Sequence, residues 1–287
     1  MRDSINDDWG IKQLQNCILN ICQYIHEFCE ENDIKYCIMG GTALGAIRHG
    51  GFIPWDDDID LFMTPGEYAK FKKIFKEKGD HNQFYLQERG RFNGGVSGAK
   101  LRMNNTKFIE EMSKDWDIHQ GIFVDIMLLQ NYPDNKLSQW WMLFWENYLQ
   151  IKVAANMHYN RRGLAVKLLL APFRWLPKRF LLDYGRRQTY KYQSTECKNY
   201  FHYYMSRPLS CSIYPKSIFE SYDLVDFETV RLRIPTGVKE YLTILFGDYI
   251  KVPDIKQIKF NQHTDNWSVN KRFEKNGDGT FADEKFY

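Results

Sequence analysis

The sequence predicts a mixed α/β (α+β) fold, in which a β-sheet core is flanked by helices and accompanied by an additional helical region. Three observations support this prediction. Apolar residues recur at spacings of three and four over 12–31, which indicates an amphipathic helix. Short apolar runs at 36–39 and 59–63 indicate buried strands. From residue 136 onward the pattern becomes helical, aromatic and basic, as far as about residue 192.

Local signals place the remaining elements in chain order. A short helix over 42–48 is expected to begin at Thr42, because threonine suits an N-cap. Pro65 suits the first turn of a helix that ends near Gly79. Strands are expected at 84–87, 99–103, 107–109 and 121–129, a hairpin at 226–234, and a helix at 236–246 that Gly247 ends.

Composition limits the class of protein. The 287 residues suffice for a sizeable core, and the formal net charge of +3 indicates little about partners. The six cysteines, with no Cys-x-x-Cys pair, are expected to be buried free thiols. The N-terminus lacks the apolar core of a signal peptide, and no apolar run is long enough to span a membrane. We therefore expect a reduced, cytoplasmic protein.

The stretch GGTALGAIRHGGFIPWDDDIDLFM, residues 40–63, places four aspartates directly before a buried strand. Asp58 and Asp60 are two residues apart and so project from the same face of that strand, while Ile59 points into the core. Two such carboxylates repel unless a cation lies between them. Mg²⁺, which takes one or two carboxylates together with substrate phosphates, is the natural ion. Asp125, a lone acid in the most hydrophobic strand, is the candidate third carboxylate.

Gly40, Gly41 and Thr42 supply the other half of this site. Glycines allow a close approach of the backbone to a ligand, and the N-terminus of the following helix suits a phosphate. Lys100 and Arg102 share one face of a strand and, like Arg48, are candidates for binding phosphates, with ordinary surface charge as the alternative. His263 is a candidate for positioning the substrate, with a structural role as the alternative.

The aspartates also have other interpretations. Asp56 and Asp57 suit either the site or a solvated loop. Counted from Asp56, the acids also match positions 1, 3, 5 and 12 of a calcium loop, but Leu61 stands where that loop requires glycine. Asp125 has the alternative of a structural aspartate bonded to backbone amides.

The segments GGTALGAIR, residues 40–48, and IPWDDDID, residues 53–60, resemble the signature of the LicD family, a branch of the nucleotidyltransferase superfamily related to fukutin and fukutin-related protein. The superfamily pattern of Gly-Gly-Thr/Ser, Asp-x-Asp and a later acid is matched by Gly40, Gly41, Thr42, Asp58, Asp60 and Asp125. The C-terminal segment from Glu240 to Pro253, with His263 beyond it, is also similar to the family, although Phe246 stands where tyrosine is expected. The resemblance covers about 36–130 and 226–265.

This resemblance implies a phosphotransferase with a nucleotidyltransferase-type core in 1–135, an acceptor- or membrane-facing helical region in 136–212, and a segment completing the core in 213–287. Members move phosphocholine, ribitol phosphate or glycerol phosphate from CDP-choline, CDP-ribitol or CDP-glycerol to a sugar hydroxyl of a glycan or lipid-linked acceptor. Acceptors are teichoic acid, capsule or lipopolysaccharide precursors. Two Mg²⁺ ions, with Mn²⁺ as the alternative, are expected at Asp58, Asp60 and Asp125.

The helical region has two interpretations. Tryptophans such as Trp140 and Trp145, interspersed with arginines and lysines, suit helices lying on an anionic membrane at the inner face of the cytoplasmic membrane. They equally suit a core helix pair with a solvated basic face. No nucleic-acid-binding module is recognised. Nucleotidyl transfer from an NTP and a non-enzymatic scaffold remain as alternative functions, and the presence of all three carboxylates argues against the scaffold.

Overall fold

The structure is a computed structural model, and it describes residues 9–88, 98–111, 114, 117–156, 164–167, 171, 178–204, 207–252, 263–264 and 266–269. Within these residues no helix combines the length and apolar character needed to cross a membrane.

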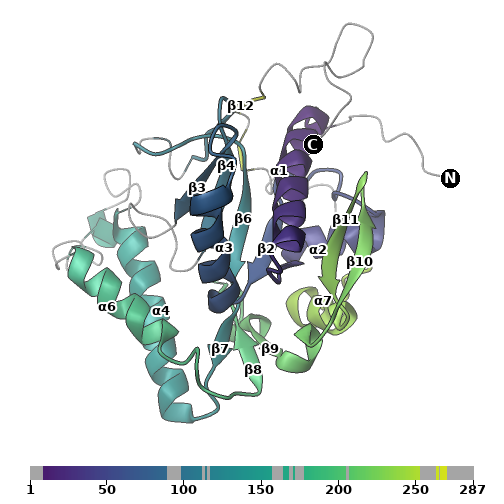
Figure 1. The fold of residues 1–287 in the computed structure, drawn as a ribbon. Helices are drawn as coiled ribbons and strands as arrows, with labels where there is room; N and C mark the ends of the chain where they lie inside the picture. The colour runs from purple at the N-terminus through teal and green to yellow at the C-terminus, as the bar shows by residue number, and fades with distance from the viewer. Residues whose placement is uncertain are drawn as a thin grey trace, which may run out of the picture.

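A five-stranded mixed sheet forms the centre of the molecule (Figure 1). Its strands are, in spatial order, β1 (Cys37–Ile38), β2 (Asp60–Met63), β6 (Phe123–Leu128), β4 (Ala99–Met103) and β3 (Phe84–Glu88). β2 and β6 run parallel, and the other neighbours run antiparallel. All five residues of β4 are buried, as a strand in the middle of a covered sheet requires. The predicted mixed α/β fold is confirmed.

Helix α1 (Lys12–Glu31) packs on this sheet against β4 and β6, and its bounds are those predicted (Figure 1). α3 (Pro65–Lys78) packs on β2. Its N-cap is Thr64, whose hydroxyl accepts a hydrogen bond from the backbone N–H of Glu67 at 3.4 Å. The helix ends at Gly79, which confirms the sequence signals at both ends.

Helix α2 (Gly40–His49) begins two residues earlier than predicted, with Met39 as its N-cap. Gly40 adopts a left-handed φ of 55°, which costs glycine little, so the helix can start at the end of β1. The prediction that Thr42 caps this helix is therefore wrong. Thr42 lies inside the first turn, and its hydroxyl accepts a hydrogen bond from the backbone N–H of Asp60 at 2.9 Å.

The C-terminal elements return to the core. The hairpin of β10 (Tyr222–Phe227) and β11 (Val230–Pro235) extends the predicted one by a few residues. α7 (Val238–Phe246) packs against α2 and ends at Gly247, which has a φ of 70°. Side chains from α1, the sheet, the hairpin and α7 form one continuous apolar core. The six cysteines are free, and all but the partly buried Cys211 are buried, as predicted.

Several short strands have no strong sequence signal. β7 (Gln130–Tyr132), β8 (Asn199–Phe201) and β9 (Ile213–Pro215) form a three-stranded antiparallel sheet. Each has only three residues, too few for apolar alternation to be visible. β5 (Lys107–Phe108), at the predicted position, pairs with β12 (Trp267–Ser268). Two short 3₁₀ helices, Leu209–Ser212 and Lys216–Phe219, flank β9.

The additional helical region contains α4 (Lys136–Asn156) and α6 (Lys178–Tyr190), which pack on each other at one side of the molecule (Figure 1). Residues 164–167 are also helical. The prolines at Pro172 and Pro177, where the sequence predicts breaks in the helical pattern, lie outside the described residues. A small second core of Tyr132, Met142, Tyr192 and Phe201 joins α4 to the three-stranded sheet.

Glu146 lies at this junction and is 1% exposed. Its Oε1 accepts a hydrogen bond from Gln130 Nε2 at 3.1 Å, whereas Gln130 Oε1 has no partner among the described residues. Burial raises the pKa of Glu146 from 4.5 to about 7. The folded protein therefore favours the protonated acid. The stability this group contributes is full below pH 4.5 and is lost as the pH rises through about 7.

We expect Glu146→Gln to increase the free energy of unfolding at pH 8.5 by up to roughly 3 kcal/mol, because the buried charge disappears. The amide also supplies an N–H to Gln130 Oε1. Near pH 4.5 the two proteins should be equally stable. Urea unfolding at both pH values measures the difference, with Glu77→Gln on the exposed face of α3 as the control. An equal effect at the two pH values would contradict the shifted titration.

Candidate active site

A cavity of about 610 Å³ lies where α2, the loop before β2 and the end of α7 meet. It has an acidic wall, a basic rim and several aromatic side chains. It is lined by Gly40, Gly41, Leu44, Arg48, Ile53, Trp55, Asp56, Asp58, Asp60, Tyr204, Arg207, Leu245, Phe246, Asp248, Tyr249, Lys251 and His263. The cavity thus gathers six of the ten residues predicted for the site: Gly40, Gly41, Arg48, Asp58, Asp60 and His263.

Three aspartates form the acidic wall. Asp58 and Asp60 both line the cavity, and Ile59 between them is fully buried, as the alternation predicts. β2 itself begins at Asp60, so Asp58 precedes the strand. Asp56 continues the same spacing of two and also lines the cavity.

The carboxylates of this wall affect one another. Burial raises the pKa of Asp56 well above its usual value, and repulsion from Asp58 and Asp60 raises it further. Burial also raises the pKa of Asp58 to about 6, with Asp57 acting in the same direction and His263 opposing it. The acidic wall is therefore an electrostatically unfavourable arrangement that a bound cation would relieve.

The glycine pair lies directly against this wall. A Cβ on Gly41 would lie 2.8 Å from Asp56 Oδ2, and one on Gly40 would lie 3.5 Å from Asp60 Oδ2. A side chain at Gly41 would displace the Asp56 carboxylate, whereas at Gly40 the left-handed φ is the constraint. Glycine is thus required both for the left-handed turn at Gly40 and for the approach of α2 to the aspartates.

The turn is held from the C-terminal side of the chain. The backbone N–H of Gly40 donates a hydrogen bond to the hydroxyl of Tyr241, on α7, at 2.8 Å. Tyr241 is fully buried, so this N–H has no access to water as a substitute. α7 therefore fixes the conformation of a glycine that lies more than 200 residues earlier in the sequence.

Asp125 lies beside the wall rather than in the cavity lining. It is the register partner of Asp60 across the parallel β2–β6 pair, and it is 6% exposed. Lys100 Nζ is 3.2 Å from Asp125 Oδ2 and also 3.2 Å from Glu110 Oε1. Asp125 therefore lies next to Asp60, as predicted, but it is paired with the buried Lys100. Its roles as metal ligand and base stay predictions.

Lys100 and Arg102 point from β4 into an internal network. Arg102 is 1% exposed, and its guanidinium donates to Gln87 Oε1 at 2.5 Å and to the carbonyl of Gly121 at 2.6 Å. Neither residue lines the cavity. A contact of either with a substrate phosphate would require these bonds to be exchanged, so this role also stays a prediction.

His263 closes the acidic wall from the C-terminal tail. Its Nδ1 is 2.6 Å from Asp57 Oδ1, its backbone N–H donates to Asp57 Oδ2 at 2.8 Å, and its Nε2 is 3.7 Å from Asp58 Oδ2. The hydrogen bond to Asp57 is the main reason that the pKa of His263 rises to about 10. The imidazole is therefore charged at neutral pH and partly offsets the aspartates.

The basic rim includes two cations that sequence reasoning missed, Arg207 and Lys251. Arg207 Nη1 donates to the carbonyl of Leu245 at 2.9 Å, and its guanidinium lies 4.9 Å from the centre of the Phe246 ring. Arg48, which was predicted, donates to the carbonyl of Tyr249 at 3.3 Å. Arg207 follows β8, outside any motif, so no local pattern could reveal it.

The donors of the acidic wall suit a hard cation such as Mg²⁺, because all are carboxylate oxygens. Among the described residues, however, no group of three or more His, Cys, Asp and Glu side chains is arranged to hold an ion as it stands. The wall therefore suits an ion that takes two protein carboxylates and completes its coordination shell with substrate phosphates. It suits less an ion whose ligands all come from the protein.

A mixed sheet whose strand end presents clustered carboxylates beside a glycine turn fits a transferase of the nucleotidyltransferase type. Comparison with known proteins agrees with this class. Residues 33–177 match the sequence model described as "LicD/FKTN/FKRP, nucleotidyltransferase domain". Because this match spans half of the chain, the protein belongs to the LicD family.

Individual relatives give further detail. The lipopolysaccharide cholinephosphotransferase LicD of Haemophilus influenzae is 28% identical over 258 residues, which cover 85% of this chain and 92% of the relative. An uncharacterised Rickettsia prowazekii protein is 58% identical over 52 residues, 18% of this chain and 20% of that protein. The human ribitol 5-phosphate transferase FKRP is 46% identical over 39 residues, 14% of this chain and 8% of that protein.

We expect Tyr241→Phe to lower the free energy of unfolding by about 1–3 kcal/mol, because the N–H of Gly40 would be buried without an acceptor. Urea unfolding measures the loss. Tyr85→Phe, which removes the hydroxyl of a tyrosine that is 49% exposed, serves as the control and should change stability little. Equal stability of Tyr241→Phe and the unmodified protein would contradict the anchoring role.

Proposed function

We propose that the protein transfers phosphocholine from a CDP-activated donor to a sugar hydroxyl of a cell-surface glycan precursor and releases CMP. Teichoic acid, capsule and lipopolysaccharide precursors are the proposed acceptors. Membership of a family whose relatives include a cholinephosphotransferase and a ribitol 5-phosphate transferase supports this reaction class. Polyol phosphates such as ribitol or glycerol phosphate are the alternative groups.

One observation carries the proposal: a single cavity joins an acidic wall to a basic rim. Asp58 and Asp60 lie on the wall, and Arg48 and Arg207 lie on the rim. A diphosphate bound between them would meet guanidinium donors on one side and carboxylates on the other. The diphosphate and the carboxylates are both anionic, so a cation must separate them. Phosphoryl transfer sites commonly meet this need with a metal ion.

The proposed step is an in-line displacement at the phosphorus that carries the alcohol. The acceptor hydroxyl oxygen forms a bond to this phosphorus, and the bond from phosphorus to the bridging oxygen of CMP breaks. The bonding electrons leave with CMP. The hydroxyl proton passes to a carboxylate, a role proposed for Asp125, whose charge Lys100 offsets at 3.2 Å. Arg48 and Arg207 hold the diphosphate of the donor and stabilise the charge that develops on the phosphate of the leaving CMP.

Asp58 and Asp60, with Asp56 beside them, are the residues we propose to hold Mg²⁺, and a second ion would be shared with Asp125. Bound Mg²⁺ would neutralise charge on the diphosphate and on the leaving oxygen. Asp56 and Asp58, whose pKa values are raised without it, would ionise fully in its presence.

Aromatic side chains in the cavity support choline over a polyol. Trp55, Tyr204, Phe246 and Tyr249 line the same cavity as the carboxylates. A quaternary ammonium is attracted to aromatic faces and to negative charge, whereas ribitol or glycerol would rely on hydrogen bonds. The relative that aligns over most of this chain is also the cholinephosphotransferase.

The first experiment is a calorimetric titration of the purified protein with CDP-choline, CDP-ribitol, CDP-glycerol, CTP and ATP, with Mg²⁺ and again with EDTA. We expect Mg²⁺-dependent binding of CDP-choline in preference to the other ligands. Preference for another CDP-alcohol would assign a different alcohol within the same reaction. Binding of CTP or ATP alone would replace the proposal with nucleotidyl transfer, and binding of none would favour a non-enzymatic scaffold.

We expect Asp58→Asn and Asp60→Asn each to reduce CMP release by at least about a hundredfold, because the diphosphate would lose its metal ligands. Folding should be retained, since removing one of several mutually repelling carboxylates relieves repulsion. CMP release and thermal unfolding are measured together, with Asp223→Asn on β10 as an exposed control. Undiminished CMP release by either variant would contradict the assignment.

We expect Arg207→Met to raise the KM for the CDP donor by about tenfold or more, because one charge-assisted bond to the diphosphate is lost. The methionine keeps much of the packing on Phe246. Arg231→Met, at a side chain that is 63% exposed on the hairpin, is the matched control. An unchanged KM would exclude Arg207 from the donor site.

A further inference from the structure

Helix α4 presents apolar side chains on two opposite faces. One face, with Met142, Trp145 and Leu149, is buried. The other face carries Leu137, Trp140, Phe144 and Ile151, which are 79%, 64%, 45% and 38% exposed. Spacings of three and four place these four residues on one side of the helix. A helix that is apolar on an exposed face is missing a partner there.

A chain of ring contacts, which we call the aromatic stripe, connects the exposed rings of α4 with those of α6 through the buried Trp145. Ring centres are 5.9 Å apart for Trp140 and Phe144, 5.4 Å for Phe144 and Trp145, 5.1 Å for Trp145 and Tyr184, and 6.2 Å for Tyr184 and Phe180. Phe180 is 70% exposed. The stripe therefore spans both helices, and its exposed rings on α4 and α6 are joined by one buried ring.

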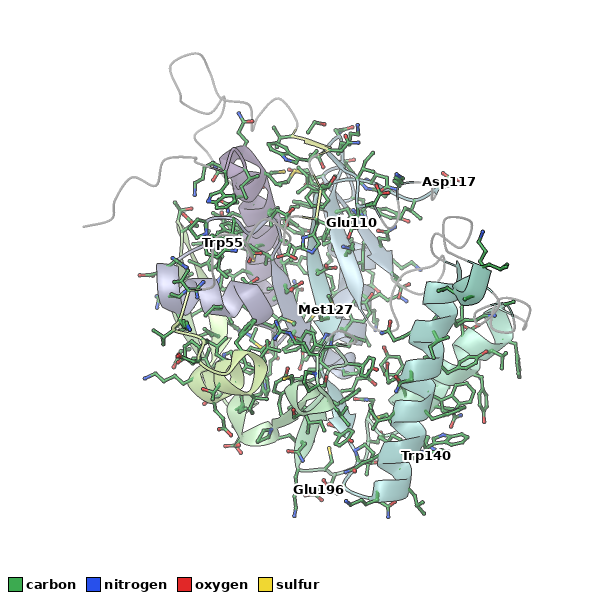
Figure 2. The ribbon with its side chains drawn as sticks, turned by 180° about the vertical axis from the view of Figure 1, so that it is seen from behind. Trp55, Glu110, Asp117, Met127, Trp140 and Glu196 are labelled. Carbon is green, nitrogen blue, oxygen red and sulfur yellow. The ribbon has the colours of Figure 1, made fainter. Side chains whose placement is uncertain are left out.

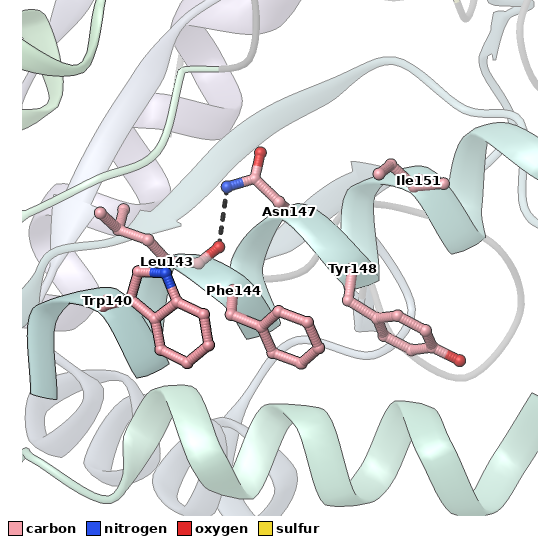
Figure 3. A pocket seen from close by; sticks show the side chains of 6 residues that line it. All are labelled: Trp140, Leu143, Phe144, Asn147, Tyr148 and Ile151. Atoms are coloured by element: carbon pink, nitrogen blue, oxygen red, sulfur yellow. Dashed lines mark hydrogen bonds between the residues drawn. The ribbon is translucent and has the colours of Figure 1, made fainter. Parts of the chain in front are cut away.

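A shallow cavity of about 410 Å³ lies along α4 within this surface (Figure 3). It is lined by Trp140, Leu143, Phe144, Asn147, Tyr148 and Ile151. Figure 3 shows these side chains following one another along the helix, with Asn147 bonded to the carbonyl of Leu143 at 2.7 Å. Asn147 supplies the main polar group of a lining that is otherwise largely apolar.

The charge of this region is strongly one-sided. Residues 136–191 contain eleven Lys and Arg but two Asp and Glu, so they carry a formal charge of +9 in a chain whose total is +3. One of the two acids, Glu146, is buried, and its pKa is raised to about 7. Arg187 and Lys191 are exposed on and just after α6, with Lys191 Nζ 5.5 Å from the centre of the Trp141 ring.

We propose that the aromatic stripe, with the basic residues around it, docks the protein on the surface of an anionic lipid bilayer. Bulky aromatic and aliphatic side chains suit the boundary between headgroups and acyl chains, and lysines and arginines suit anionic headgroups. Neither feature alone identifies the partner. A second copy of this chain would explain the apolar groups, but it would bring like charges together across the interface.

The stripe is separate from the catalytic cavity. Figure 2 shows Trp55, which lines the cavity, and Trp140, in the stripe, on opposite sides of the molecule. The inference also does not depend on the proposed reaction, since it concerns residues that take no part in it.

The test is co-sedimentation of the full chain with vesicles, without donor or acceptor. One set contains phosphatidylglycerol and phosphatidylcholine, and the other contains phosphatidylcholine alone. We expect binding to the anionic vesicles, little binding to the neutral ones, and a steep fall of binding in high salt. Equal binding to both sets, or binding to neither, would overturn the proposal without any variant.

Variants then locate the surface. Trp140→Ser combined with Phe144→Ser should reduce vesicle partitioning by about tenfold or more, and Arg187→Glu by about fivefold or more. Leu224→Ser, at a leucine of the hairpin that is 43% exposed, is the matched control for Phe144 and should bind as the unmodified protein does. Thermal unfolding confirms that each variant is folded.

Three results would overturn the assignment of this surface. The first is unchanged partitioning of both stripe variants. The second is an equal loss in Leu224→Ser. The third is a dimer, seen by sedimentation velocity, that the double substitution converts to monomer. Failure of vesicle binding with intact CMP release would refute the docking surface alone and leave the proposed transfer reaction standing.

Discussion

The parallel pairing of β2 with β6 sets Asp60 beside Asp125 at the centre of the sheet, and the rest of the site is arranged around the charge that results. Acids at this position repel, and burial strengthens the repulsion. Cations from distant parts of the chain offset it on either side: Lys100 pairs with Asp125, and His263 pairs with Asp57 and approaches Asp58. These pairs do not compensate all of the negative charge of the acidic wall, and the remaining charge faces the cavity, where a ligand can bind.

The site is completed by residues that lie far apart in the sequence. The glycine turn and the aspartates come within about twenty residues of each other, but Tyr241 holds the turn, and Arg207, Tyr249 and His263 close the cavity. Hence a fragment ending before α7 would retain the signature without the conformation that makes it a site. The C-terminal segment belongs to the site as much as the motif does.

Sequence reasoning succeeded where the signal was local. The helix at 12–31 follows from its period, and the common orientation of Asp58 and Asp60, with Ile59 buried between them, follows from their spacing. It failed at Thr42, because the freedom of Gly40 to adopt a left-handed conformation let the helix start earlier. It also missed Arg207, because this residue reaches the cavity only through the tertiary fold and belongs to no local sequence motif.

The helical region is less independent of the core than its composition suggests. β8 belongs to the small sheet on which α4 is seated, and the same segment continues within a few residues to Tyr204 and Arg207 at the cavity. The basic-aromatic helices and the basic rim are therefore connected through one short stretch of backbone. Arg207 follows β8 by six residues, so the same segment of the chain supplies a strand to the small sheet and a cation to the cavity.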